Sequence, residues 1–524
     1  MDFKLLLDTL ARSSAQAVTT LHQGNEKERE LKDYLYIETD IEKDFKDLLD
    51  GGLEAGSVLF LCGSSGDGKS ELLKRYHRKY SESFRFHLDA THSFKPDQTA
   101  VQALDQLFDE HQRSPEPMIV GINVGMLFNY QSSGAERHAG IKNAIACFIE
   151  GENSSSNYQF VNFEDYPKFS LEEGAVGSKF VSELLRRVTS NDTENPLYRA
   201  YKMDPSKEVD LKFHNYRLLQ EPAIQKVIVR ALLHARLKFD QFFSARALLD
   251  FIHHLIAGDS VLFDNLFAAP GYGLANSLVG LDPCLLRSQK VDQFVVQYAL
   301  CIADQDFEEF KEAYYKKYGY QELSPSSWIR AFYCLQEVEL GNNYHEYFSK
   351  DFALPLFDEY IYAWQLHHSS GSKKQLREFY KKQLIESLMK FANRLESKII
   401  DNGIFLEKIN DIIVSAKVDV RADLTRIADA NQKKHQIHCF HAVIKVDQIQ
   451  LEPFPVTISF LELAQRILGG YRPNRHDKNA VVILEEVIEK LVSIANTTKS
   501  IHFHNQGKEW TLKLEDEEFV VEAG

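Results

Sequence analysis

The sequence predicts an α/β core built on a parallel sheet, followed by helical regions and a small α+β part at the C-terminal end. Three observations support this prediction. A buried apolar run, residues 58–62, stops abruptly at a glycine-rich loop, as the central strand of a parallel sheet does. Strand and helix patterns then alternate up to about residue 188. Long amphipathic helical patterns replace them from about residue 195, and short β-like runs return from about residue 436.

The length of the chain, 524 residues, is too great for a single hydrophobic core. An apolar fraction of 44% is typical of globular proteins. The changes of pattern divide the chain into five predicted regions. They are an N-terminal helical segment (1–50), the α/β core (51–195), a helical lid (196–300), an all-α region (301–435) and a C-terminal α+β region (436–524).

Within these regions, apolar spacing predicts the individual elements. Core strands are expected at 58–62, 84–88, 118–124 and 158–163. Helices are expected at 3–23, directly after the glycine-rich loop, and at 96–112, 136–150, 180–188, 223–237, 244–257 and 291–301. Pro96 and Asp97 are residues that open helices, so they are expected to begin the helix at 96–112. The late β-like runs lie at 438–446, 501–503, 510–514 and 519–521.

The loop after the first strand matches the pattern G-x-x-x-x-G-K-[ST] without a mismatch. Its glycines allow backbone conformations closed to residues with a Cβ, so that successive N–H groups can turn toward an anion. The helix that follows adds the positive end of its dipole. Lys69 is expected to reach the β- and γ-phosphates, and the Ser70 hydroxyl is expected to complete a Mg²⁺ shell.

This motif between a strand and a helix predicts a P-loop NTPase core, AAA-like with its helical lid, with ATP and Mg²⁺ as cofactors. A glycine-rich turn without a ligand is the alternative. The predicted nucleotide-binding residues are Gly63, Ser64, Ser65, Gly66, Asp67, Gly68, Lys69 and Ser70.

Hydrolysis also needs carboxylates at the end of a buried strand, one for Mg²⁺ and usually another for the attacking water. No apolar run in the sequence closes in Asp-Glu. Glu164 and Asp165 follow the fourth predicted strand as an adjacent acidic pair, so they rank slightly above Asp89, which ends the second. A solvated strand-end carboxylate is the alternative for each acid. Asn123, near the end of the third strand, is a candidate sensor of the γ-phosphate.

Three arginines and one aromatic segment complete the candidate machinery. Arg246 lies in the first turn of the helix at 244–257 and fits the γ-phosphate sensor of AAA-like lids, with a plain surface arginine as the alternative. Arg186 and Arg187 could serve a neighbouring subunit as arginine fingers, although a solvated helix face is favoured for both. Residues 34–37 are candidates for stacking on the base, with simple packing favoured.

The formal net charge of −15 argues against wholesale neutralisation of nucleic-acid phosphates by this chain. Its most basic loop in the C-terminal part, residues 469–478, places Tyr471 beside Arg472, Arg475 and Lys478. Such a patch could contact phosphates and stack on a base, but a solvated loop is favoured.

The six cysteines are scattered without a C-x-x-C pair, so buried thiols in a reducing cytosol are expected rather than disulfides or a zinc site. Surface histidines are favoured over a metal site in the β-like runs, because no acid or cysteine completes a ligand set. These histidines are His435, His438, His441, His502 and His504. No signal-peptide pattern and no run of about 18 apolar residues occurs. A soluble cytoplasmic protein is therefore expected.

Three stretches around the loop resemble the DptF family, the ATPase-like components of bacterial DNA phosphorothioation-dependent restriction. They are Leu-Lys-Asp-Tyr-Leu-Tyr-Ile (31–37), Leu-Phe-Leu-Cys-Gly-Ser-Ser-Gly-Asp-Gly-Lys-Ser-Glu (59–71) and His-Leu-Asp-Ala-Thr-His-Ser-Phe (87–94). The likeness is strongest over roughly residues 30–170. Lys69 and Ser70 are the site residues that it carries over.

The resemblance implies an ATP-binding and ATP-hydrolysing subunit that acts with partner proteins resembling DptG and DptH in defence against foreign DNA. The DNA attacked would lack the sulfur-for-oxygen backbone modification of the host, and it would be contacted through the complex. No nuclease motif is recognisable in the sequence. A nucleotide-binding regulatory module without turnover remains the alternative, and a nucleotide kinase lacks the signature of a second substrate pocket.

Overall fold

A computed structural model of the chain describes most of its residues in two compact units. Unit 1 comprises Met1–Phe169, Gly177–Leu233 and Gln241–Phe352, and unit 2 comprises Ser170–Val176, His234–Asp240 and Ala353–Gly524. The boundaries predicted at residues 50, 195 and 300 fall inside unit 1. The described residues are 3–11, 26–90, 98–151, 157–205, 210–240, 243–268, 273–369, 373–396, 399, 403–433, 435–474, 477–498, 500–505, 508–515 and 518–523.

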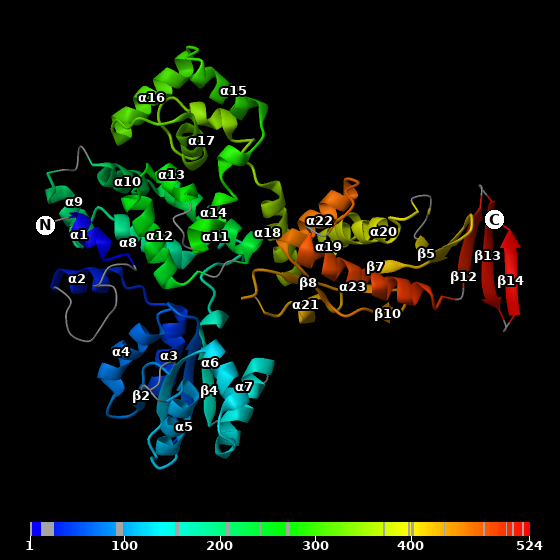
Figure 1. Cartoon of the computed structure of the whole chain (residues 1–524), viewed down its shortest axis with the longest axis horizontal. Coiled ribbons are helices and arrows are strands. Elements are labelled where there is room, and N and C mark those ends of the chain that lie inside the picture. The colour runs from blue at the N-terminus through cyan, green and yellow to red at the C-terminus, as the bar shows by residue number, and fades with distance from the viewer. Residues whose placement is uncertain are drawn as a thin grey trace. The chain divides into compact units, whose positions relative to one another are not determined.

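Unit 1 contains a parallel sheet of four strands (Figure 1). The strands follow the order β2 (Arg85–His87), β3 (Met118–Asn123), β1 (Val58–Gly63) and β4 (Tyr158–Asn162). β1 lies in the interior and pairs in parallel with β3 on one side and with β4 on the other. Every residue of β1 is buried. The prediction of a buried central strand in a parallel sheet is confirmed.

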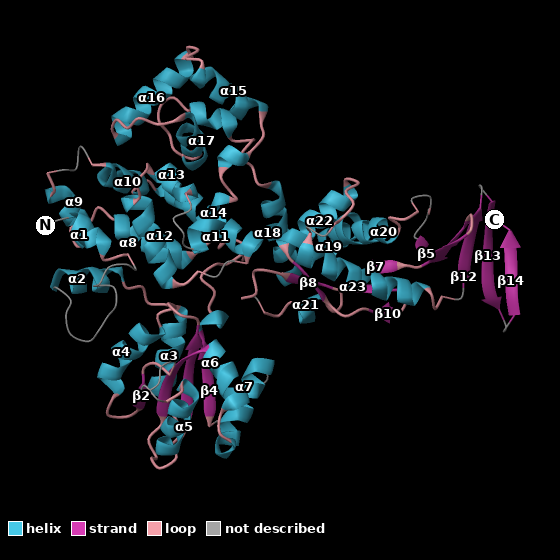
Figure 2. Cartoon of the chain, in the orientation of Figure 1, coloured by secondary structure: helices cyan, strands magenta, loops and turns pink. Residues whose placement is uncertain are grey.

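Helices cover both faces of this sheet, because successive side chains of β1 point to opposite sides. Phe60 packs in a layer with α5 (Ala100–His111), α6 (Val124–Ser133) and α7 (Ala139–Glu150). Leu59 and Leu61 pack on the other face with α3 (Asp40–Gly51) and α4 (Lys69–Tyr80). The sheet is therefore the middle of three layers (Figure 2). Since its strands are parallel, their carboxyl ends meet at one edge.

Helix caps explain where two of the helices in this core begin. α5 begins after a capping box in which Thr99 and Gln102 exchange side chain-to-backbone hydrogen bonds. The predicted openers, Pro96 and Asp97, lie outside the described residues. α6 follows β3 without a loop, and the sequence did not predict this helix because its cap, Asn123, lies within the apolar run of the strand.

The remainder of unit 1 is helical, as the change of pattern after residue 195 predicts. Its helices are α1 (Phe3–Asp8), α2 (Glu26–Leu35), α8 (Lys179–Thr189), α9 (Pro196–Met203), α10 (Leu211–Leu219), α11 (Pro222–Phe239, which continues into unit 2), α12 (Ala245–Ala257), α13 (Leu262–Phe267), α14 (Gly273–Val279), α15 (Gln289–Ala299), α16 (Gln305–Tyr318) and α17 (Pro325–Cys334). Buried Asn215 joins α10 to the α12–α13 connection through the carbonyl groups of Ile256 and Ser260 and the N–H of Leu262. Of the helix predicted at 3–23, the first residues are helical, and residues 12–25 lie outside the described part.

Unit 2 combines helices with antiparallel strands. Its helices are α18 (Pro355–His368), α19 (Lys373–Phe379), a π-helical segment (Tyr380–Ile385), α20 (Glu386–Ala392), α21 (Ile427–Ala430), α22 (Ile458–Leu468) and α23 (Lys478–Ala495). Its strands are β5 (Gly403–Ile409), β6 (Ile412–Lys417), β7 (Val420–Ala422), β8 (Phe440–Ala442), β9 (Ile444–Val446), β10 (Ile449–Gln450), β11 (Phe454–Val456), β12 (Ser500–Asn505), β13 (Lys508–Glu515) and β14 (Glu518–Ala523). They form sheets with the orders β14-β13-β12-β6-β5, β10-β9-β7 and β11-β8.

The prediction of an all-α region up to residue 435 is wrong, because β5, β6 and β7 lie within it. β5 and β6 form a hairpin whose turn contains Asn410 at a φ of 54°, a conformation that asparagine tolerates better than most residues. β6 then pairs with β12, which is far along the chain. Pairing over such a distance is not visible in a local pattern of residues.

The cysteines and the helices bear on two further expectations. Cys62, Cys334 and Cys439 are buried thiols, but Cys301 is exposed, so burial does not extend to all six. Among the described residues, no helix has both the length and the apolar character needed to cross a membrane.

The packing of β3 gives a prediction about stability. A Cβ added at Gly121 would lie 2.5 Å from Cδ1 of Leu73 and 2.8 Å from the carbonyl oxygen of Leu88. Because the backbone of Leu88 cannot turn aside, Gly121→Ala is expected to lower the free energy of unfolding by about 1–3 kcal/mol. Urea denaturation followed by circular dichroism measures this change.

The matched control is Gly51→Ala at the end of α3, where an added Cβ meets nothing within 4 Å. This variant is expected to change the free energy of unfolding by less than about 1 kcal/mol, because alanine is a better helix former than glycine. Equal losses of stability in the two variants would contradict the close packing at Gly121.

Candidate functional site

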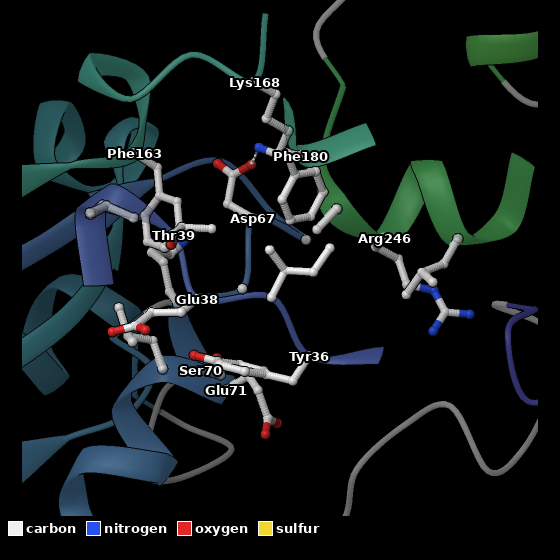
Figure 3. Close-up of a pocket in the computed structure, with 18 of the residues that line it drawn as sticks. Tyr36, Glu38, Thr39, Asp67, Ser70, Glu71, Phe163, Lys168, Phe180 and Arg246 are labelled. Carbon is white, nitrogen blue, oxygen red and sulfur yellow. Dashed lines mark hydrogen bonds and ion pairs between the residues drawn. The ribbon is translucent and has the colours of Figure 1, made fainter. Parts of the chain in front are cut away.

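A cavity of about 890 Å³ lies in unit 1 at the edge of the sheet where the strands end. Its lining includes four parts of unit 1, namely the glycine-rich loop, the strand ends, the segment around residues 31–41 and the start of α12, together with residues 9–10 and the start of α8. Figure 3 shows side chains from all four parts. A cavity of this size is in the range that holds a small-molecule ligand or cofactor.

The loop requires glycine at three positions, and not all for the same structural reason. Gly66 and Gly68 have φ values of 84° and 106°, which residues with a Cβ rarely adopt. Gly63 does not have a positive φ, but a Cβ at this position would lie 2.9 Å from Cβ of Phe163. The turn therefore depends on two left-handed glycines and on one close approach. Gly68 is the N-cap of α4, so the loop leads directly into the N-terminal end of that helix.

Lys69, the first residue of α4, folds back over the loop. Its Nζ donates hydrogen bonds to the carbonyl oxygens of Gly63 (2.9 Å) and Ser64 (2.7 Å). Burial lowers the pKa of Lys69, and the negative charges of Asp67 and Asp89 oppose this effect. Ser70 is exposed and lines the cavity. The two residues that the motif assigns to phosphate and metal therefore lie together at the cavity.

The three candidate acids are placed differently. Asp89 follows β2 and Asp165 ends a 3₁₀ turn after β4 (Phe163–Asp165), and both line the cavity. Glu164 is not part of the lining. Neighbouring side chains in a 3₁₀ turn point in directions about 120° apart, so Glu164 and Asp165 do not face the cavity as the adjacent pair that the sequence suggested. Asp89 is also the strand-end acid that affects the pKa of Lys69.

Asn123 lies at the end of β3, opposite Gly63 of β1, and lines the cavity. Its Oδ1 accepts a hydrogen bond from the N–H of Met126 at 2.6 Å and so caps α6. Because the oxygen is held by this cap, the part of the side chain that suits a ligand is the amide nitrogen, which can donate to an anion.

Arg246 lies where α12 meets the glycine-rich loop. Its backbone N–H donates to the carbonyl oxygen of Gly66 at 3.4 Å. Its Nη2 donates to the carbonyl oxygen of Leu10 (3.2 Å) and to Oδ1 of Asp250 (3.1 Å), while its buried Nε has no hydrogen-bond partner. The structure therefore brings Arg246 to the cavity, with its guanidinium held by α12 and the end of the N-terminal helix.

The segment before the core is an extended strap, residues 36–39, along the cavity. Nη1 of Arg187 on α8 donates to the carbonyl oxygens of Tyr34 (2.8 Å) and Tyr36. The guanidinium of Arg75 lies 3.4 Å from the centre of the Tyr36 ring, so one face of this candidate stacking ring is already covered.

The prediction of a solvated helix face is wrong for Arg187, because its side chain is 28% exposed and binds the strap. It agrees with the structure for Arg186, whose side chain is 62% exposed and pairs with Glu183. Both arginines contact Glu183, and their hydrogen bonds lower the pKa of Glu183 to about 2.

Among the cavity residues that sequence reasoning missed is Lys168. Its Nζ lies 3.5 Å from Oδ1 of Asp67, and the two side chains point toward one another in Figure 3. Lys168 comes after β4 and belongs to no motif. The available signal in the sequence was Asp67, a carboxylate inside the glycine-rich loop, because a buried carboxylate usually needs a positively charged partner.

Three candidate residues of unit 2, Tyr471, His502 and His504, make local contacts. The guanidinium of Arg466 lies over the Tyr471 ring, 3.6 Å from the ring centre. The hydroxyl of Tyr471 donates a hydrogen bond to Asp477 at 2.9 Å. Arg475, of the predicted basic patch, lies outside the described residues. His502 contacts Thr511 and His504 contacts Glu509. Among the described residues, no three His, Cys, Asp or Glu side chains group as a metal site would require.

Comparisons of the chain with protein-family models, with curated proteins and with solved structures give no match.

The strap gives a second prediction. Arg187→Ala removes two hydrogen bonds to backbone carbonyls and leaves these acceptors without their charged donor. The free energy of unfolding is expected to fall by about 1–3 kcal/mol. Hydrogen exchange of the amides in residues 34–39 is expected to speed up at the same time.

Arg186→Ala is the matched control. Arg186 is the neighbouring arginine and pairs with the same carboxylate, Glu183, but its side chain is exposed. We expect this variant to change stability by less than about 1 kcal/mol. If both variants exchange the strap amides at the wild-type rate, Arg187 does not hold the strap.

Proposed function

We propose that unit 1 binds ATP with Mg²⁺ in its cavity and hydrolyses it, as one subunit of a multi-protein assembly. The observation that carries the proposal is the glycine-rich loop. It lies at the carboxyl end of the central strand, has left-handed glycines at 66 and 68, and leads into the N-terminal end of α4. Backbone N–H groups and a helix N-terminus arranged in this way favour a phosphate chain.

In this proposal Lys69 exchanges its hydrogen bonds to the carbonyl oxygens of Gly63 and Ser64 for the β- and γ-phosphates. Its Nζ already lies over the loop, so the exchange needs only a local movement of the side chain. The exposed hydroxyl of Ser70 then holds Mg²⁺ together with a carboxylate.

We assign the carboxylate for Mg²⁺ to Asp89, ahead of the pair Glu164 and Asp165 that the sequence favoured. The charge of Asp89 acts on Lys69, whereas Glu164 is not part of the cavity lining. Asp165, which does line the cavity, is the candidate for orienting the attacking water. The amide nitrogen of Asn123 and the guanidinium of Arg246 are the candidate donors to the γ-phosphate.

A module that binds ATP without turning it over is the second candidate function. One observation favours it: Asp89 is followed by Ala90, which is buried. The strand that supplies the proposed metal carboxylate therefore supplies no second acid for the water.

The assembly that we propose is a bacterial DNA phosphorothioation-dependent restriction complex, which defends against foreign DNA. This part of the proposal rests on the resemblance around the loop to the DptF family. Partner proteins resembling DptG and DptH would complete the complex and contribute the contact with DNA.

Calorimetric titration of the chain with ATP and Mg²⁺ tests binding. Lys69→Ala removes the charge that faces the phosphates, so the dissociation constant is expected to rise by about 10-fold or more. Lys79→Ala is the matched control, because Lys79 lies on the exposed part of the same helix. An unchanged affinity for ATP in Lys69→Ala would contradict the proposed nucleotide site.

The choice between the acids is tested by ATP turnover, measured with and without DNA and the partner proteins. Asp89→Asn is expected to lower turnover by about 100-fold or more, because the metal loses its charged ligand. Glu164→Gln is expected to stay within about threefold of the wild-type chain. The opposite result would restore the ranking of Glu164 and Asp165 ahead of Asp89 that the sequence favoured. Binding of ATP without measurable turnover in the wild-type chain would support the second candidate function.

A further inference from the structure

The glycine-rich loop contains a negative charge where a triphosphate would be expected to require positive ones. The side chain of Asp67, between Gly66 and Gly68, is fully buried. Its Oδ2 accepts a hydrogen bond from the N–H of Ser64 at 2.7 Å, which joins the start of the loop to its tip. The carboxylate therefore braces the turn, but it also places a charge beside the phosphate site.

Lys168 lies on the other side of this carboxylate. Its Nζ is 3.5 Å from Oδ1 of Asp67, and its side chain is 14% exposed. The carbonyl oxygen of Lys168 accepts a hydrogen bond from the hydroxyl of Ser178, and this hydroxyl accepts the N–H of Val181 at the start of α8. The cap of α8 therefore holds the backbone from which Lys168 reaches Asp67.

We propose that Lys168 neutralises Asp67 and thereby sets the affinity of the site for the nucleoside triphosphate. This inference rests on the proposed nucleotide site. Lys69 cannot perform both tasks, because its ammonium is assigned to the phosphates. Without Lys168, the buried charge of Asp67 faces the phosphates uncompensated, in surroundings where charges are weakly screened. Lys168 is thus a positioning residue that acts through Asp67.

The proposal makes the effect depend on the charge of the ligand. Lys168→Met is expected to raise the dissociation constant of ATP–Mg²⁺ about 10- to 100-fold, which corresponds to about 1.4–2.8 kcal/mol. The loss for ADP is expected to be smaller, because ADP carries fewer charges near the loop. A change in the folding of the loop alone would weaken both nucleotides alike.

The second variant removes the carboxylate as well. Asparagine keeps an acceptor for the N–H of Ser64 without the charge, so Asp67→Asn combined with Lys168→Met is expected to bind ATP within about threefold of the wild-type chain. Asp67→Asn alone is expected to bind ATP more tightly, because Lys168 is then uncompensated. This single variant tests the inference even if Lys168→Met does not fold.

Lys142→Met is the matched control. Lys142 has a similarly buried side chain, 15% exposed, and an ion pair with Glu136 at 2.6 Å, but it is not part of the cavity lining. Its removal is expected to leave the affinity for ATP unchanged. Thermal unfolding of every variant separates lost affinity from lost structure.

Calorimetry of the full chain at constant ionic strength distinguishes the outcomes. Unchanged affinity in Lys168→Met overturns the inference, while the result for Lys69→Ala still decides the proposed function. A loss that Asp67→Asn does not relieve means that Lys168 contacts the phosphates directly, and this also overturns it. A wild-type chain that binds no ATP overturns both proposals.

Discussion

The burial of β1 is the constraint on which the rest of unit 1 depends. Its backbone is paired on both edges and its side chains are packed on both faces. At the carboxyl end of this strand the chain turns through the glycine-rich loop into α4. Gly63 packs closely against Phe163 at this point, so the start of the turn is supported by side-chain packing. The parallel arrangement brings Asp89, Asn123 and Asp165 to the same edge, although each lies at the end of a different strand.

Charged side chains lie behind and beside the turn. Asp67 is buried with Lys168 as its partner, and Lys69 is held by two carbonyl oxygens. Burial lowers the pKa of both lysines, because a charged ammonium is less stable away from water. A buried charge of this kind depends on its partner more strongly than an exposed one does. Lys168 thus compensates the charge of Asp67, while the ammonium of Lys69 is held by neutral carbonyl oxygens.

The helical part of unit 1 contacts two parts of the cavity wall, the strap and the glycine-rich loop. Arg187 on α8 holds the extended strap by its carbonyl oxygens, and the first turn of α12 meets the tip of the loop at Gly66. Arg246 links this turn to the end of the N-terminal helix. The loop, the strap and the helices therefore share direct contacts. These contacts connect the loop that lines the cavity directly to the first turn of α12.

The sequence by itself determined β1, the glycine-rich loop and α4, because their signals lie within about twenty neighbouring residues. It also predicted the change from an α/β pattern to helices. Only the tertiary structure decided which strand-end acids reach the cavity, that Arg187 binds the strap, and that Lys168 pairs with Asp67, 101 residues away in sequence. It likewise revealed the strands within the region expected to be all-α, since β6 pairs with the distant β12. Contacts between distant residues leave no periodicity in the chain, so they are determined only when the elements pack.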